Sequence, residues 1–191
     1  HVVAVVCTHG HNDHIGVAPE LSALLDAPVL LNPADTMLWE MTHGDKGFRA
    51  IEDDQVLKAD GIELHAIATP GHSPGSTCLY APALGAVFSG DTLFQGGPGA
   101  TGRSFSDFPT ILGSIRDKLG RLPADTVVYT GTLTLDYPLE ALYSALRTYT
   151  TEHGALNVVF AGRPAREAHP AGGAALHRVR HHHRGSGPEN R

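Results

Sequence analysis

The chain has 191 residues, 41% hydrophobic and 18% charged, which favours one soluble globular domain with a single sizeable core. Residues 1–160 hold 8 basic and 18 acidic residues, which argues against nucleic acid as a partner because phosphate binding needs clustered lysine and arginine. No run approaches the roughly 20 apolar residues of a membrane span, so no membrane partner is expected either.

The N-terminal part of the chain predicts alternating strands and helices. Residues 2–8 form an uninterrupted β-branched run, which predicts a buried strand. A helix is expected next, with Pro19 in its first turn and leucines at helical spacing, ending at residues 26–28. Residues 28–31 then predict a short strand, and residues 33–41 predict a second helical stretch.

The following segments continue the same alternation. Apolar and polar residues alternate over residues 62–68, which predicts a half-exposed strand. Residues 77–80 and 86–89 predict two strands joined as in a hairpin. A helix is expected from about residue 108 to 119, with an apolar face made by Ile111, Leu112, Ile115 and Leu119. Residues 126–130 predict the last strand, so the fold class is α/β.

The sequence also predicts the extent of the domain, the state of the two cysteines and the positions of the remaining histidines. Residues 1–160 are expected to form the domain, and residues 161–191, which lack an apolar period, are expected to form a disordered tail. Cys7 and Cys78 lie in apolar segments, so buried thiols are favoured over a disulfide, which fits a reducing, cytoplasmic location. Surface or tail positions are expected for the histidines without ligand-like spacing, which are His43, His65, His153, His169, His177 and the tract 181–183.

Four side chains that can bind a metal follow the first predicted strand within six residues. They are His9, His11, Asp13 and His14. Imidazoles and carboxylates suit zinc or iron, and two histidines spaced two apart on an extended segment can converge on one ion while the next pair turns toward a second. A polar surface loop is the alternative, but such loops rarely concentrate three histidines and an aspartate.

His72 and Asp91 stand where two further predicted strands end. His72 lies in the segment 69–76, where proline and glycine form a tight turn that can hold an imidazole in one place. A structural histidine and a turn-capping aspartate are the alternatives for the two residues taken singly. Their combination with residues 9–14 favours metal binding by both.

In this order, the motifs strongly resemble the metallo-β-lactamase superfamily, and more closely its hydroxyacylglutathione hydrolase (glyoxalase II-like) branch. The resemblance runs from about residue 2 to residue 130 and includes residues 88–94. It implies the αββα sandwich of that family. His14 stands where the best-known β-lactamase class has arginine, and His11 stands where the flavodiiron relatives have glutamate, so both of those groups are disfavoured.

The resemblance also implies the roles of the site residues. His9, His11 and His72 would hold a first metal ion; Asp13 and His14 would hold a second; and Asp91 would bridge them. The implied cofactor is zinc, as one or two ions, with iron as an alternative. Asp13 and Asp91 are the implied catalytic residues, because they would orient the nucleophile and accept its proton.

The chain departs from the family pattern near both ends. The family places several strands ahead of the segment that begins at Val2, so the sandwich is expected to be incomplete. The family closes its site with Thr-Gly-His-Gly, whereas this chain has Thr132 in place of the histidine, which leaves the second metal one ligand short. Beyond about residue 131 the resemblance ends, which indicates either a reading-frame change or genuine divergence.

The implied activity is metal-dependent hydrolysis of a small-molecule thioester of the hydroxyacylglutathione type by a zinc-activated hydroxide. Two alternatives stay open. One is a persulfide dioxygenase with a single iron held by His9, His72 and Asp91, a two-histidine, one-carboxylate set. The other is a truncated or frame-shifted product that binds metal without activity. The oligomeric state is left open.

Overall fold

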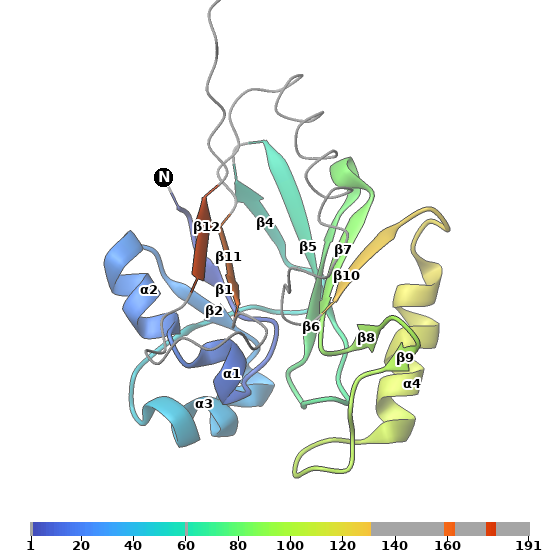
Figure 1. Ribbon diagram of the computed structural model, residues 1–191, viewed down its shortest axis with the longest axis horizontal. Helices are drawn as coiled ribbons and strands as arrows, with labels where there is room; N and C mark the ends of the chain where they lie inside the picture. The colour runs from blue at the N-terminus through green and yellow to red at the C-terminus, as the bar shows by residue number, and fades with distance from the viewer. Residues whose placement is uncertain (1, 60, 131–158, 163–174, 179–191) are drawn as a thin grey trace, which may run out of the picture.

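A computed structural model describes residues 2–59, 61–130, 159–162 and 175–178, and its main body is a pair of facing sheets (Figure 1). The first sheet is parallel and has the order β1-β2-β3, with β1 at Val5–Val6, β2 at Val29–Leu31 and β3 at Arg49–Ala50. The second sheet has the order β10-β7-β6-β5-β4, and only its β10–β7 pair is parallel. Its strands are β4 (Val56–Ala59), β5 (Ile62–Ala68), β6 (Thr77–Ala81), β7 (Ala86–Gly90) and β10 (Val127–Thr130).

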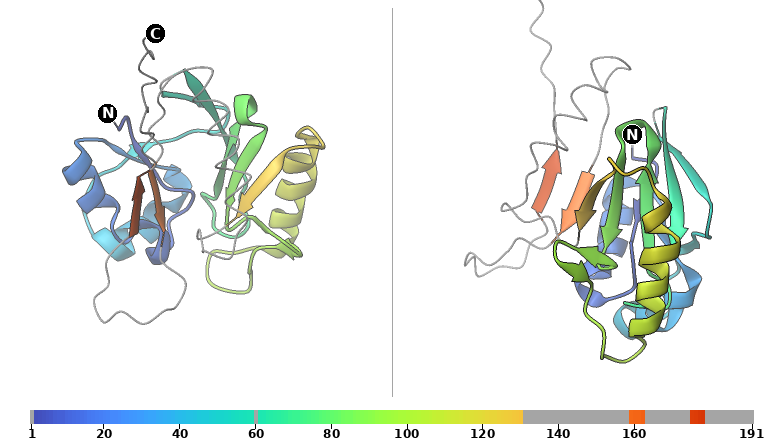
Figure 2. Two further views of the ribbon diagram at one scale, coloured as in Figure 1. Left: turned by 45° about the horizontal axis from the view of Figure 1, so that its top comes forward. Right: turned by 90° about the vertical axis from the view of Figure 1, so that its right-hand side faces the viewer.

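Helices cover the outer side of each sheet, and the two groups lie on opposite sides of the molecule (Figure 2). The first sheet carries α1 (Asn12–Ile15), α2 (Ala18–Leu25) and α3 (Thr36–His43), and the second carries α4 (Phe108–Asp117). Three single 3₁₀ turns are η1 (Pro33–Asp35), η2 (Pro82–Leu84) and η3 (Leu119–Arg121). Within the described residues, no helix is both long enough and apolar enough to cross a membrane.

The core consists of three apolar layers that match this αββα order. Between the two sheets lie Leu30, Ile51, Ala66 and Leu79. Between the first sheet and its helices lie Cys7, Ile15, Ala18, Val29, Leu31 and Trp39. Between the second sheet and α4 with η3 lie Cys78, Val87 and Leu119, with Ile67 and Ile115 packed against them. The predicted α/β class and the αββα layering are therefore confirmed.

The alternation of side chains along a strand explains why each sheet is apolar on both faces. In β2 all three residues are buried, but Leu30 faces the other sheet, whereas Val29 and Leu31 face the helices. In β6, Leu79 likewise faces the other sheet, whereas its neighbour Cys78 faces α4 and η3. A strand covered on both faces reads as a continuous apolar run, since successive side chains alternate between two buried layers.

Helix ends follow from local chemistry. Proline stands in the first turn of α2, and Asp26 closes that helix in the left-handed conformation. Asp107 caps α4, because its side chain accepts a hydrogen bond of 2.8 Å from the backbone N–H of Thr110. The loop before α4 is tied to the turn between β5 and β6, since the N–H of Asp107 donates to the carbonyl of Gly71 at 2.7 Å.

Several boundaries differ from those expected. The predicted strand 2–8 is shorter, because β1 pairs only with β2, through Val5 and Val6, and α1 was not expected. Leu112 is 43% exposed, so its predicted place on the apolar face of α4 is wrong. Leu24, one of the leucines at helical spacing in α2, is 70% exposed. Leucine spacing identified the helices, but which turn of each helix meets a sheet depends on its packing angle.

Two short antiparallel pairs lie outside the main sheets. One joins β8 (Leu93–Phe94) to β9 (Gly97–Pro98), directly after Asp91. The other joins β11 (Val159–Gly162), which spans the expected boundary at residue 160, to β12 (Ala175–Arg178), which lies within the expected tail. Most of residues 131–191, including Thr132, lies outside the described residues, so the domain boundary at 160 and the disordered tail stay predictions.

Candidate metal centre

The candidate ligands lie on three segments that follow strands of the two sheets. His9 and His11 are in the loop between β1 and α1, and His14 is in α1. His72 is in the turn after β5, and Asp91 follows β7 directly. A backbone hydrogen bond of 2.8 Å from the N–H of Thr77 to the carbonyl of Thr8 joins the start of β6 to the loop after β1. Both sheets therefore contribute to one cluster.

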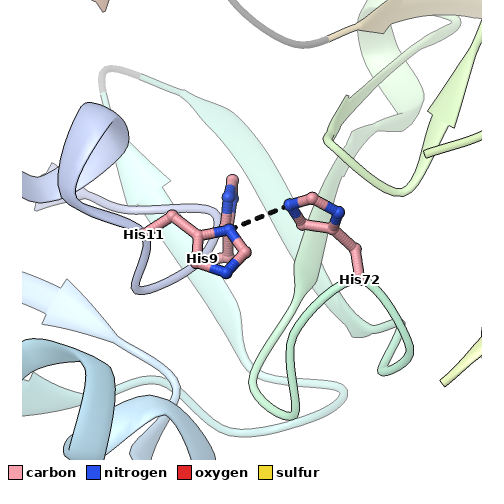
Figure 3. Close-up of side chains that lie close together, drawn as sticks. All are labelled: His9, His11 and His72. Carbon is pink, nitrogen blue, oxygen red and sulfur yellow. Dashed lines mark hydrogen bonds between the residues drawn. The ribbon is translucent and has the colours of Figure 1, made fainter. Parts of the chain in front are cut away.

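Three imidazoles converge at the centre of this cluster (Figure 3). His11 Nδ1 lies 3.0 Å from His72 Nε2. The ring centroids of His9 and His11 are 4.8 Å apart, as are those of His9 and His72. One nitrogen of each ring lies within 4.8 Å of the others. Zinc–nitrogen bonds of about 2.0–2.1 Å in a tetrahedron place two ligand nitrogens about 3.3 Å apart, so this spacing is close to that of a bound ion.

The surroundings of the His9 and His72 rings fit a metal ion. His9 is 1% exposed, and its Nε2 is buried without a hydrogen-bond partner, which is unusual for a polar atom in a protein interior. Thr8 Oγ1 lies 3.2 Å from the other nitrogen of that ring. His72 Nδ1 donates to the carbonyl of Ala100 at 2.8 Å, which leaves the lone pair of Nε2 directed into the cluster. Such second partners fix the tautomer of metal-binding histidines.

Burial also favours the neutral imidazoles that metal binding needs. Burial of the ring is the largest cause that lowers the pKa of His9 well below its ordinary value, and three neighbouring imidazoles lower it further. The pKa of His11 is lowered as well, again chiefly by burial. A neutral ring keeps the lone pair that a cation would accept. The donor set therefore suits zinc or iron.

A second group consists of His9, His14 and Asp91. Asp91 lies between the two groups, since its Oδ1 is 3.4 Å from His14 Nε2 and its Oδ2 is 3.6 Å from His72 Nε2. This position allows the carboxylate to bridge two ions. However, both groups use His9, which has a single free nitrogen, so the described residues provide one complete three-histidine set and one partial set.

The remaining sequence candidates lie apart from these groups. Asp13 is outside both, with a half-exposed side chain whose Oδ2 lies 3.8 Å from His14 Nε2. His43, expected at the surface, is partly buried, packs on Trp39 and hydrogen-bonds the carbonyl of Ile15 at 2.9 Å. His65 lies on β5, with its Nε2 3.6 Å from Glu63 Oε2, and belongs to neither group.

Sequence reasoning missed the residues that support the ligands. The largest omission is Asp35, which is fully buried and accepts hydrogen bonds from both ligand-bearing loops. Its place after Asn32-Pro33-Ala34 resembles an ordinary helix-start signal. The only trace of its role in the sequence is that Gly10 and Gly75 are small, because a Cβ on either would meet Asp35 at 2.9 Å or less.

Comparison with known proteins agrees with this geometry. The model of the metallo-beta-lactamase superfamily matches residues 1–131. "Probable metallo-hydrolase YqgX" of Bacillus subtilis is 37% identical over 142 residues, which cover 68% of this chain and 67% of that protein. "Hydroxyacylglutathione hydrolase GloC" of Haemophilus influenzae is 31% identical over 143 residues, which cover 66% of each. The chain thus spans about two thirds of the length of these relatives.

Solved structures give the same result. The crystal structure of TTHA1623 in a di-iron-bound form is 32% identical, with a TM-score of 0.62 over 68% of this chain and 69% of that one. The crystal structure of BLEG-1 B3 metallo-beta-lactamase is 28% identical, with a TM-score of 0.58 over 68% of each chain. Matched by its family model, its relatives and its layered fold, this chain belongs to the metallo-beta-lactamase superfamily.

Proposed function

We propose that this chain is a metal-dependent hydrolase whose substrate is a small-molecule thioester of the hydroxyacylglutathione type. The observation that carries the proposal is the convergence of His9, His11 and His72 on one point, with the buried Nε2 of His9 lacking any hydrogen-bond partner among the described residues. The name of the relative GloC supports the substrate class. The two buried free cysteines are compatible with a reducing, cytoplasmic location, which is part of the proposal.

Each residue of the centre has a distinct part in this proposal. His9, His11 and His72 would hold the ion, and Asp91 would contact the same ion or bridge to a second at His14. A bound metal ion supplies a Lewis acid that makes water acidic near neutral pH and stabilises negative charge on a carbonyl oxygen. The Asp91 carboxylate, which is 21% exposed, would accept a hydrogen bond from the attacking water and orient it. A thiolate then leaves without strong general-acid help.

Zinc is the proposed metal, and iron is the alternative. The di-iron form of TTHA1623, a structure 32% identical to this chain, favours testing iron directly. The second candidate function is a persulfide dioxygenase using His9, His72 and Asp91. The approach of Asp91 Oδ2 to within 3.6 Å of His72 Nε2 is the observation that favours it, since two histidines and a carboxylate suit non-haem iron.

One experiment separates these candidates. The purified chain would be stripped of metal, reloaded with zinc or iron(II), and assayed for loss of thioester absorbance with a hydroxyacylglutathione and for oxygen uptake with glutathione persulfide. A matched oxygen ester and the H72A variant serve as controls. Thioester turnover that depends on metal and on His72 supports the proposal. Oxygen uptake without thioester turnover would replace it with the dioxygenase, and the absence of both would leave a metal-binding chain without activity.

A further inference from the structure

Asp35 is the most completely buried carboxylate beside the candidate metal centre. It is 0% exposed and stands at the junction of η1 and α3. No lysine or arginine in the described part of the chain forms an ion pair with it. A buried charge without a cationic partner is costly unless hydrogen bonds satisfy it. The hydrogen-bond donors to Asp35 therefore indicate its role.

Those partners belong to the two loops that carry the histidines. Asp35 Oδ2 accepts from the N–H of Gly10 at 2.7 Å and from Ser73 Oγ at 2.7 Å, and Oδ1 accepts from the N–H of Gly75 at 2.6 Å. Gly10 lies between His9 and His11 in the chain, and Ser73 follows His72 directly. One carboxylate therefore joins two loops whose ligands His11 and His72 are 61 residues apart in the chain. Hydrogen bonds to an ionised carboxylate are short and strong.

The packing around Asp35 shows that this junction has little freedom. A Cβ added to Gly10 would lie 2.9 Å from the Asp35 Cβ, and one added to Gly75 would lie 2.7 Å from its carboxyl carbon. Ser73 is also held by Ser76, whose Oγ accepts from the Ser73 N–H at 3.0 Å and lies 2.9 Å from its Oγ. A shift of Asp35 would therefore move both loops relative to one another.

We infer that Asp35 is a positioning residue of the metal centre: its carboxylate clamps the loop of His9 and His11 to the turn of His72, so that the three imidazoles meet at the spacing of a bound ion. The buried negative charge, which accepts a hydrogen bond from the residue between His9 and His11, also favours a cation in the cluster. This inference rests on the metal site of the proposed function, but not on the identity of the substrate.

The test compares three variants with the unmodified chain. D35N keeps the size of the side chain, removes its charge, and turns an NH₂ group toward at least one of the three donors. S73A removes one of the three hydrogen bonds to Asp35, together with the contact between Ser73 Oγ and Ser76 Oγ. D53N is the matched control, because Asp53 also accepts from a backbone N–H, that of Ala68 at 2.7 Å, and pairs with Lys118 at 2.7 Å, but it contacts neither ligand loop.

Three measurements are made on each protein: the zinc dissociation constant by competition with a chelator, the visible spectrum at saturating cobalt(II), and thermal unfolding of the metal-free form. We expect D35N to weaken zinc binding about 10- to 100-fold, as loss of a supporting partner does in other metal sites, and to shift the cobalt bands. S73A should change both in the same direction but less, and D53N should leave both unchanged.

The outcomes separate the two proposals. If the unmodified chain does not bind zinc, the metal site and this inference both fail. If it binds zinc and folded D35N retains its affinity and cobalt spectrum, only the role of Asp35 is overturned. Should D35N fail to fold, S73A decides, and unchanged binding and spectrum in that variant overturn the role. An equal loss in D53N would show general destabilisation and would overturn it as well.

Discussion

His11 Nδ1 and His72 Nε2 lie 3.0 Å apart although 61 residues separate them in the chain. His72 Nδ1 already donates to the Ala100 carbonyl, so the Nε2 that faces His11 carries a lone pair. The geometry brings two potential ligand atoms from segments that follow different sheets to one point.

Removing His72 should abolish tight metal binding. The H72A variant leaves only His9 and His11 of the three-histidine group. Loss of a residue that hydrogen-bonds to a ligand weakens metal binding about 10- to 100-fold, so we expect loss of a ligand itself to lower zinc affinity by more than about 100-fold. Elemental analysis after dialysis against a weak chelator measures this. H65A is the control, because His65 lies on β5 beside Glu63 and belongs to neither metal-binding group. Full zinc content in H72A would contradict the assignment.

The chain should hold at most about one tightly bound metal ion. The two groups of the cluster share His9, and Thr132 stands where the family has its closing histidine, so the second ion lacks ligands. Zinc content per chain is the measurement. T132H is expected to raise it if the turn at that position directs the new side chain inward. Two equivalents in the unmodified chain would show that another residue supplies the missing ligand.

The metal-free protein should lose stability as the pH falls below about 6.5, the ordinary pKa of histidine. Burial, the largest cause, lowers the pKa of His9 in the folded state, so the unfolded chain binds more protons in the interval between the two pKa values. The free energy of unfolding therefore rises with pH across that interval. The contribution of His9 to stability is lost as the pH decreases through the same interval. His11 shifts in the same direction.

Urea unfolding of the chelator-treated protein at about pH 7.5 and about pH 5.5, on either side of that pKa, measures this dependence. The H9N variant should show a flatter dependence, because the side chain that resists protonation is gone. Equal unfolding midpoints for the unmodified chain at both pH values would refute the expectation.

Substituting Gly71 should disturb the centre through the backbone. Gly71 has a φ of +134°, and a Cβ there would overlap the backbone of Ile111. We expect G71A to lower the free energy of unfolding by about 1–3 kcal/mol from backbone strain, with further loss from the steric contact, and to weaken zinc binding by displacing His72. Denaturant unfolding and zinc titration measure the two effects.

The matched control is G113A, because Gly113 lies within α4 and a Cβ there meets nothing within 4 Å. This change is expected to stabilise the protein by about 0.5–1 kcal/mol, since alanine is the better helix former. Similar destabilisation by both substitutions would show that Gly71 has no special role.

The two thiols should be inert in the folded protein. Burial raises the pKa of Cys7 to about 12 and that of Cys78 to about 11, so neither provides much of the reactive thiolate near pH 8. A chromogenic disulfide reagent should label no more than a trace of thiol before denaturant is added and both thiols afterwards. Rapid labelling of the native protein would show that the segment around Cys7 or Cys78 opens readily.

The sequence by itself determined the family, the α/β class and the residues that can bind a metal. Periodicity was sufficient for β5, β6, β7 and α4, because local apolar patterns reflect which faces become buried. The cluster at residues 9–14 and His72 were visible as residue types at particular spacings. The predicted buried thiols are confirmed, since Cys7 and Cys78 are both free and buried.

Only the tertiary structure decided which of these side chains meet. Asp13 and His14 are neighbours in sequence, yet His14 joins a group with Asp91 while Asp13 stays half exposed, because helix α1 directs adjacent side chains to different faces. The segment around Asp35 had no local signal beyond that of a helix start, and the partners of Asp35, Gly10 and Gly75, are distant in sequence. Its function depends on two glycine-containing loops arriving beside it from 25 and 40 residues away, and contacts at such separations are set by the packing of the whole fold rather than by any local pattern.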